Sequence, residues 1–305
     1  MKLILAGTTE FGIPAFEKIV KNFSVPLVIT QPDRPTGRKQ ILTPSEVKLW
    51  AEKKGLPIKQ PEKISELQDF ILDLNPDLML VAAYGQIIPK NILDIPKFGS
   101  INIHGSILPK YRGASPIQAA ILNGETETGI TLIKMDEKMD HGPILSIKKA
   151  TIDENETFVE LHKRLSHLAS ENIVDTLTAY LENKLNPEIQ DHKRATYTKL
   201  LTKEDGRIRW TSPAIKIHQQ IRALNPEPGT WSILDDKSVK ILRTAINRDN
   251  KIELPGKIYR KDNDMLVKCS DFSLIIKEIQ PEGKKPMTGV DFLNGLKNLE
   301  TKIFV

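Results

Sequence analysis

Residues 99–116 read GSINIHGSILPKYRGASP, and this stretch decides the fold. Ile101 and Ile103 alternate with Asn102 and His104, which is the pattern of a strand. Because alternate side chains of a strand point to the same side, the isoleucines can enter a core while an amide and an imidazole face one common space. The glycines and prolines that follow predict a loop, so this polar pair lies where a strand ends.

Short apolar runs and helical patterns alternate along the chain before this stretch. We predict strands at Lys2–Ala6, Val25–Thr30, Pro57–Gln60, Leu78–Ala83 and Gly99–His104, with helices between them. This alternation is typical of an α/β fold with a Rossmann-like, mostly parallel sheet, in which ligands bind at the carboxyl ends of the strands. A nicotinamide cofactor is not expected, because the glycines after the first strand do not form the G-x-G-x-x-G motif.

Two further strands are predicted at Gly129–Met135 and Ile144–Ile147, and the short link between them favours a hairpin that would make the sheet mixed. The link carries Asp140 in the sequence MDHGPIL. A carboxylate in this position can orient an imidazole and stabilise its charged form, so Asp140 joins the polar pair as a candidate catalytic residue. The apolar pattern over Phe158–Leu181 predicts one long helix.

The loop after the second strand reads QPDRPTGRKQILTPS over residues 31–45. Its three prolines argue against any regular element, and Arg34, Arg38 and Lys39 make it a modestly basic, exposed segment. Ser45 is the predicted N-cap of a helix over Glu46–Lys54.

The net charge of +5 is unevenly distributed along the chain. Residues 206–305 contain 18 lysines and arginines against 12 acidic residues, whereas the rest contains 26 against 27. After a helix at Pro213–Ala223, five short β-like runs in this basic part predict a small OB-like barrel. The runs are Thr230–Leu234, Val239–Thr244, Gly256–Tyr259, Met265–Lys268 and Leu274–Ile279. A basic barrel suggests a polyanionic partner, and a barrel that only supports the first domain is the alternative.

These patterns predict a domain over residues 1–185 that carries the chemistry, a linker over 186–206 and a basic barrel domain over 207–305. The single cysteine, Cys269, excludes an internal disulfide, which fits a reducing compartment, so we expect a cytoplasmic protein. No apolar run is long enough to span a membrane, and no spacing of histidines and cysteines predicts a metal site.

Longer segments resemble a known family. INIHGSILPKYRGASPIQAAILNGETETGITLIKMDEKMDHGPIL is similar to the signature of the transferases that use 10-formyltetrahydrofolate. QPDRPTGR, IRALNPEPGTW and EIQPEGKKPM resemble the members of that family that act on the methionine of initiator tRNA. The matches are spread from AGTTEFG to QPEGKKPM, which covers nearly the whole chain.

The resemblance implies an enzyme that transfers a formyl group from 10-formyltetrahydrofolate to the α-amine of methionyl-initiator tRNA. It implies Asn102, His104 and Asp140 as the catalytic set. The segments that match the family's folate-binding parts are Ser106, Ile107, Leu108 and Pro109, with Tyr84 and Gly85 beside them. Arg38 matches a basic position that meets the tRNA acceptor end, and Arg34 and Lys39 are predicted to contact tRNA with it. The resemblance implies no metal, and we expect a monomer.

Two departures from the family pattern are present. His141 follows Asp140 where small residues are common, and the loop after Arg38 continues with Gln40 and Ile41 and is therefore only modestly basic.

Three alternatives are weighed against this function. A formyltransferase acting on a small amine such as an amino sugar, or a hydrolase of 10-formyltetrahydrofolate, would share the catalytic set but have less use for a separate basic domain. A non-catalytic RNA-binding protein would bind tRNA without needing Asn102 or His104.

Overall fold

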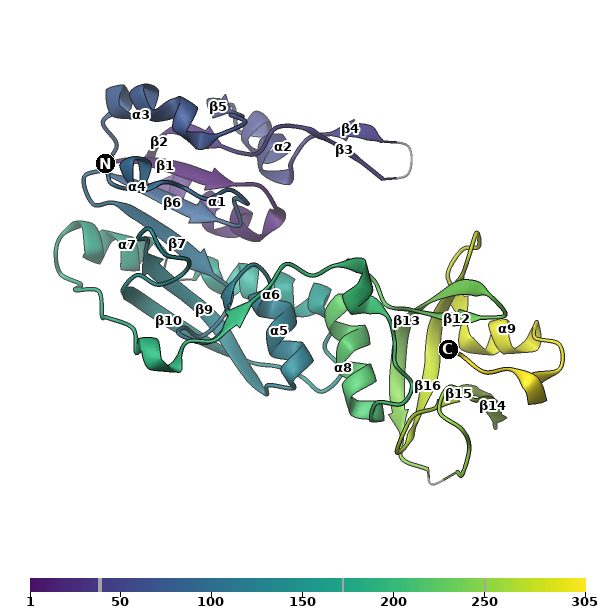
Figure 1. Cartoon of the computed structure of the whole chain (residues 1–305). Helices are drawn as coiled ribbons and strands as arrows, with labels where there is room; N and C mark the ends of the chain where they lie inside the picture. Colours follow the sequence, from purple (N-terminus) through teal and green to yellow (C-terminus); the bar gives the residue numbers. More distant parts are fainter. Residues whose placement is uncertain (38–39, 172, 250) are drawn as a thin grey trace. The chain divides into compact units, whose positions relative to one another are not determined.

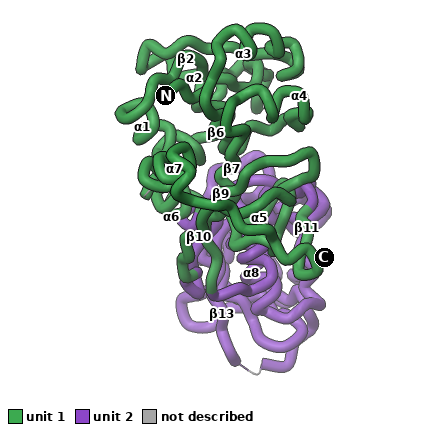
Figure 2. Tube along the Cα trace, turned by 90° about the vertical axis from the view of Figure 1, so that its left-hand side faces the viewer, with its two compact units in different colours: residues 1–116, 127–151, 162–198 green, residues 117–126, 152–161, 199–305 purple. Residues whose placement is uncertain are grey.

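The computed structural model describes residues 1–37, 40–171, 173–249 and 251–305. The chain divides into two compact units (Figure 2). Unit 1 comprises residues 1–116, 127–151 and 162–198, and unit 2 comprises residues 117–126, 152–161 and 199–305. None of the helices in this described part of the chain combines the length and the apolar character that a membrane span requires.

Unit 1 is built on a seven-stranded sheet with the order β10-β9-β7-β6-β1-β2-β5. Its strands are β1 (Lys2–Gly7), β2 (Ser24–Ile29), β5 (Ile58–Lys59), β6 (Leu78–Ala82), β7 (Ser100–His104), β9 (Glu127–Lys134) and β10 (Ile144–Thr151). The strands from β5 to β7 pair in parallel, whereas β9 is antiparallel to both β7 and β10. The predicted Rossmann-like sheet and its mixed edge are confirmed.

Helices cover this sheet because its central strands are apolar on both faces (Figure 1). They are α1 (Ile13–Asn22), α2 (Glu46–Lys53), α3 (Gln68–Leu74), α4 (Lys90–Leu93), α6 (Phe158–Ser170) and α7 (Ile173–Leu181). On one face, Ile71 of α3 and Ile92 of α4 pack with Ile4 and Leu27 of the strands. Ser45 caps α2 as predicted, accepting a hydrogen bond of 3.0 Å from the Lys48 amide.

The prediction of a single helix over 158–181 is wrong, because the structure has α6 and α7 instead. The Ser170 hydroxyl donates to the carbonyl of His167, and the Glu171 amide donates to the carbonyl of Leu168. Bonds to the third residue back tighten the last turn of α6, so the apolar pattern continues while the helix does not.

The prediction that the loop over residues 31–45 holds no regular element is also wrong. Arg34–Thr36 (β3) and Ile41–Thr43 (β4) pair as a short antiparallel hairpin that extends away from the sheet (Figure 1). The Thr36 and Thr43 hydroxyls are hydrogen-bonded across the pair at 2.6 Å. Because these two strands form a sheet by themselves, the missing amide of Pro35 costs no bond to a further strand.

Unit 2 contains the predicted five strands as one curled antiparallel sheet, with the order β12-β13-β16-β15-β14. They are β12 (Trp231–Leu234), β13 (Lys237–Asn247), β14 (Ile258–Lys261), β15 (Asp264–Lys268) and β16 (Ser273–Pro281). The short β17 (Met287–Thr288) pairs with β16, and α8 (Ala214–Leu224), α9 (Gly289–Asn294) and most of α5 (Pro116–Asn123) complete the unit. The arrangement is consistent with the predicted OB-like fold.

The remaining elements are short. Strands β8 (Arg112–Gly113) and β11 (Tyr197–Thr198) pair in parallel, and 3-10 turns lie at Glu10–Gly12, Ile64–Leu67, His192–Arg194, Lys203–Gly206 and Leu299–Thr301.

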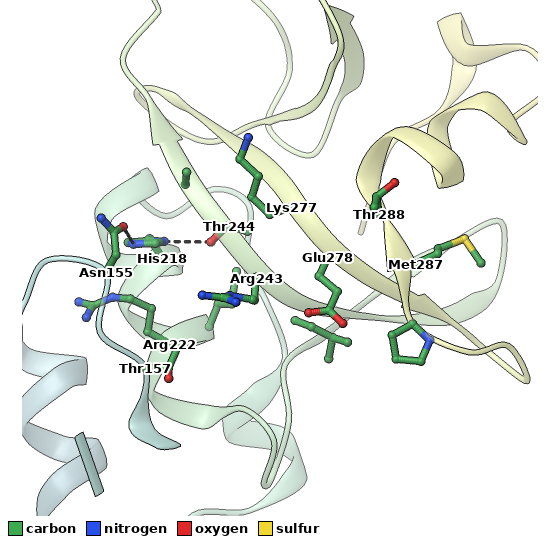
Figure 3. Close-up of a pocket in the computed structure, with 14 residues that line it drawn as sticks. Asn155, Thr157, His218, Arg222, Arg243, Thr244, Lys277, Glu278, Met287 and Thr288 are labelled. Atoms are coloured by element: carbon green, nitrogen blue, oxygen red, sulfur yellow. Dashed lines mark hydrogen bonds between the residues drawn. The ribbon is translucent and has the colours of Figure 1, made fainter. Parts of the chain in front are cut away.

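Unit 2 has an open pocket of about 630 Å³ that is lined by residues of α8, β13, β16 and β17 and by Asn155 and Thr157. His218 stands at one side of it, between Thr244 and Asn155, with ring nitrogens 2.9 and 3.2 Å from their side-chain oxygens (Figure 3). Arg222 and Arg243 also line the pocket. Their charges are offset by nearby acidic groups, namely Glu154 and Glu156 beside Arg222, Glu160 beside Arg243, and Glu278 in the wall itself.

Candidate active site

The carboxyl end of β7 brings Asn102 and His104 to one side of the sheet, and the turn between β9 and β10 brings Asp140 to them. The Asn102 amide Nδ2 donates to Asp140 Oδ1 at 3.3 Å. His104 Nδ1 lies 3.5 Å from the same oxygen. β9 pairs antiparallel with β7, so Lys134 at the end of β9 lies opposite Ile101 near the start of β7, and the turn that follows runs back to place Asp140 beside Asn102 and His104. The three predicted catalytic residues therefore lie together.

The Asp140 carboxylate is held on its other side by a backbone donor. The Gly113 amide donates to Oδ2 at 2.7 Å, while Oδ1 faces Asn102 and His104. Asp140 itself adopts a φ of +49°, in the left-handed region that aspartate tolerates better than most residues. The turn thus places the Asp140 carboxylate in the site, with Oδ2 bonded to the backbone and Oδ1 facing the other two candidate residues.

The contacts of His104 define which of its nitrogens carries a proton. The ring is 5% exposed, and Nε2 lies 2.9 Å from the carbonyl oxygen of Tyr111. A carbonyl oxygen can only accept, so Nε2 is the N–H donor. Nδ1, which faces Asp140, is therefore the ring position that can gain a proton during a reaction.

The predicted folate-binding loop follows directly after β7 and is held by hydrogen bonds from the neighbouring strand β9. The Thr131 hydroxyl donates to the Ser106 carbonyl at 2.6 Å and accepts from the Leu108 amide at 3.2 Å. The Ser106 hydroxyl donates to the Lys110 carbonyl at 2.6 Å. Ser106 and Leu108 are buried, and Ile107 and Pro109 are half-buried. The inward hydroxyl and leucine thus hold the loop, which leaves the backbone and Ile107 as its outward groups.

Tyr84 and Gly85 follow β6, the strand next to β7. The Tyr84 ring is buried in the apolar core of unit 1, and this burial raises the pKa of its hydroxyl to about 12. Its carbonyl accepts from the Thr8 hydroxyl at 2.6 Å and from Gln31 at 3.2 Å. Gly85 is exposed with a φ of +84°. The exposed part of this segment is therefore its backbone.

Of the three predicted tRNA-contacting residues, the structure describes Arg34. Arg34 is exposed in β3 and forms an ion pair of 2.5 Å with Glu62. Arg38 and Lys39 lie outside the residues that the structure describes.

Sequence reasoning missed the hydrogen-bond donors that fix Asp140 in the site. Gly113 supplies the donor to Asp140, and Gln190 donates to the carbonyl of Asp140 at 2.9 Å. Gln190 stands in a polar segment with no periodicity that would have identified it. His141, the unusual neighbour of Asp140, hydrogen-bonds to Asp136 at 2.6 Å and stacks on His192, with ring centroids 4.0 Å apart.

Comparison with known proteins matches both parts of the chain to one family. Residues 3–177 match the family described as formyl transferase, and residues 200–297 match its C-terminal domain. The chain is 40% identical to the methionyl-tRNA formyltransferase of Hydrogenobaculum sp. over 304 residues, covering 100% of both proteins. It is 42% identical to that of Geobacter sulfurreducens over 301 residues, covering 97% of this chain and 94% of the relative.

Solved structures share the fold at lower identity. The sugar 3N-formyl transferase WlaRD, crystallised in the presence of dTDP and 5-N-formyl-THF, has a TM-score of 0.69 and 22% identity, covering 93% of this chain and 99% of that one. HypX from Aquifex aeolicus, in complex with tetrahydrofolic acid, has a TM-score of 0.65 and 16% identity, covering 96% of this chain and 46% of that one.

Proposed function

The chain belongs to the methionyl-tRNA formyltransferase family, and we infer that it transfers the formyl group of 10-formyltetrahydrofolate to the α-amine of methionyl-initiator tRNA. Membership over the full length carries this inference, because relatives at 40% identity and above cover both units rather than the catalytic part alone. The cluster of Asn102, His104 and Asp140 at the end of β7 supports it from the chemistry of the site.

We propose that the two substrates are divided between the parts of the chain. Folate binds at the loops after β6 and β7, whereas tRNA is contacted by the basic unit 2 and by Arg34, Arg38 and Lys39. The excess of positive charge in residues 206–305 supports the assignment of tRNA to unit 2. We further propose that the enzyme acts as a monomer in the cytoplasm and needs no metal.

The groups available at these loops fit a flat, conjugated ring system. Gly85 and Ala83, on either side of the buried Tyr84, are exposed, so their backbone can approach a ligand, and Ile107 adds an apolar side chain. Binding sites for such ligands combine apolar contact with a few backbone donors and acceptors. We propose that residues 106–109 and 84–85 hold the folate, which supplies the activated formyl group.

We propose the following roles for the catalytic set. The neutral amine attacks the formyl carbon, a C–N bond forms, and the carbonyl oxygen becomes an oxyanion. The second N–H of the Asn102 amide, which is not used on Asp140, donates to that oxygen. The proton lost from the attacking nitrogen passes to Nδ1 of His104 or to Asp140. The oxyanion then re-forms the carbonyl as the bond to the folate nitrogen breaks, and the same proton passes to that nitrogen, so that tetrahydrofolate leaves.

A transfer assay tests the function. Purified protein, 10-formyltetrahydrofolate and methionylated initiator or elongator tRNA are incubated, and formyl-methionine is measured on each. We expect formylation of the initiator species. Consumption of folate without formylated tRNA would move the acceptor to a small amine or to water. Tight tRNA binding that survives Asn102→Ala, with no transfer by any form, would indicate a non-catalytic RNA-binding protein.

A further inference from the structure

Gln190 connects the turn of Asp140 to a second, buried part of unit 1. Its side chain is only 4% exposed. Nε2 donates to the carbonyl of Asp140 at 2.9 Å and to the carbonyl of Gly142 at 2.7 Å. Both hydrogens of the amide are therefore used on the backbone of one three-residue turn.

The other end of the same amide is held by Arg112. Oε1 of Gln190 accepts from Nη2 of Arg112 at 2.6 Å and from Nε at 3.3 Å. A guanidinium can only donate, so it fixes the oxygen of the amide toward itself and the two N–H groups toward the turn. The orientation of Gln190 is thus determined from both sides.

Arg112 is 1% exposed, and it forms no ion pair with a carboxylate among the described residues. Its further contacts are His192 Nδ1 at 2.9 Å and the Tyr197 hydroxyl at 3.4 Å. Burying a guanidinium among neutral groups is costly unless they are well placed hydrogen-bond acceptors. Burying Arg112 with Gln190 and His192 therefore costs free energy that an apolar core at this position would not.

The segment that carries Gln190 is itself fixed to the loop after β7. The Arg112 amide donates to the Thr196 carbonyl at 2.8 Å, and the Tyr111 amide donates to the Thr196 hydroxyl at 2.8 Å. Thr198 and Gly113 pair across β11 and β8. Residues 188–198, which we call the strap, thus hold both the loop that supplies the Gly113 donor and the turn that supplies Asp140.

We propose that Gln190 is a positioning residue for catalysis, which keeps the Asp140 carboxylate directed at Asn102 and His104, and that Arg112 orients it. A φ of +49° is less favourable than the right-handed region even for aspartate, so bonds from outside the turn stabilise this conformation. The amide of Gln190 supplies two of them. This inference rests on the proposed function, because it assigns Asp140 to the transfer reaction.

Gln190→Glu separates positioning from stability. The variant keeps an oxygen for Arg112, and the new ion pair favours the folded state, but it places a carboxylate oxygen against the carbonyls of Asp140 and Gly142. We expect kcat to fall about 10- to 100-fold, as displacement of a catalytic group by about 1 Å does. We expect the KM values for folate and tRNA to change less than about threefold, and the melting temperature to be unchanged or higher.

Gln220→Glu is the matched control, because Nε2 of Gln220 also bridges two backbone carbonyls, those of Asp205 and Arg207, at 2.8 and 3.1 Å in unit 2. We expect wild-type kcat for it, and any effect of its added charge on tRNA binding to unit 2 is read separately in the KM for tRNA. Gln190→Met, which removes both sets of bonds without adding charge, is measured in parallel and is expected to lose kcat as well.

Three results would overturn the inference. They are a wild-type kcat in Gln190→Glu, a kcat loss that Gln220→Glu shares, and a loss in both Gln190 variants that follows a drop in melting temperature and is therefore structural. Failure of the proposed function is distinguishable, since the wild-type protein would then formylate no tRNA in the same assay.

Discussion

The amide of Asn102 donates to Oδ1 of Asp140 across 3.3 Å, although 38 positions separate the two residues in the chain. One lies in a strand of the parallel part of the sheet, and the other lies in the turn of the antiparallel edge. The bond uses one of the two hydrogens that the amide carries. A single amide can therefore be fixed by the protein and still offer a donor to a substrate.

Asn102→Ala removes that donor and should lower kcat by about 100- to 1000-fold, the usual cost of one oxyanion donor. His104→Ala should cost a similar factor by removing the proton acceptor. Affinity for tRNA, measured by filter binding, should stay within about twofold, because neither residue lies in a segment proposed to bind RNA. Asn22→Ala, at the end of α1, is the control. Parallel loss of tRNA affinity would mean that these residues support the structure instead.

Arg38→Ala tests the tRNA role of the β3–β4 hairpin. Loss of one phosphate contact should lower kcat/KM for tRNA several-fold and reduce the slope of log kcat/KM against log salt concentration by about 1. The KM for folate should not change. Lys53→Ala, which removes an exposed charge at the end of α2, is the control. An unchanged salt slope in Arg38→Ala would remove this residue from the interface.

Gly142→Ala tests how closely the Asp140 turn approaches β9. A Cβ at Gly142 would overlap the carbonyl oxygen of Lys134, which belongs to the backbone and cannot rotate away. We expect a lower melting temperature and a loss of kcat together, since the turn must shift. Gly295→Ala is the control, because its nearest neighbour would lie at 3.5 Å, an ordinary contact. Equal behaviour of both variants would contradict the packing at this turn.

His218 should make stability fall in weak acid. Burial, with Arg222 nearby, lowers its pKa from 6.5 to about 4. Below about pH 6.5, His218 therefore binds a proton in the unfolded chain but stays neutral in the folded chain. Its contribution to the free energy of unfolding is complete above this pH and is lost as the pH falls toward 4. The full effect is about 3 kcal/mol at 1.36 kcal/mol per pH unit. Urea titrations of wild type, His218→Gln and the control His167→Gln should show a flatter pH dependence only for His218→Gln.

Cys269 should be unreactive in the folded protein. It is buried in the core of unit 2, and burial raises the pKa of its thiol to about 12. Since the thiolate is the reactive form, a thiol reagent at pH 8 should label the protein only after denaturant is added. Rapid labelling of the native protein would show that this core opens.

Periodicity was sufficient for the elements whose neighbours are other apolar residues. The alternation at Ile101 and Ile103 predicts both the strand and the shared side of Asn102 and His104, because a strand of period 2 leaves little choice. The same reasoning failed at residues 158–181, where the apolar pattern runs through a break made by local hydrogen bonds. It also failed at the β3–β4 hairpin, since two isolated strands do not need every backbone donor that proline removes.

The supporting part of the site was beyond reach of the sequence for a different reason. Gln190 and Gly113 act through hydrogen bonds to backbone atoms of residues distant in the chain, and such contacts leave no spacing pattern. The only sequence signal was indirect, namely a polar segment too long to be a simple turn. Pairing of Tyr197 and Thr198 with β8 explains why that segment is ordered.

The strap lies beyond the end of the first family match. The first family match ends at residue 177, yet Gln190 and the Thr196 contacts lie after it. A fragment truncated at residue 177 would retain Asn102, His104 and Asp140 and lose the bonds that hold their loops. The candidate catalytic side chains therefore lie within the first family match, whereas the segment that holds their loops lies after it.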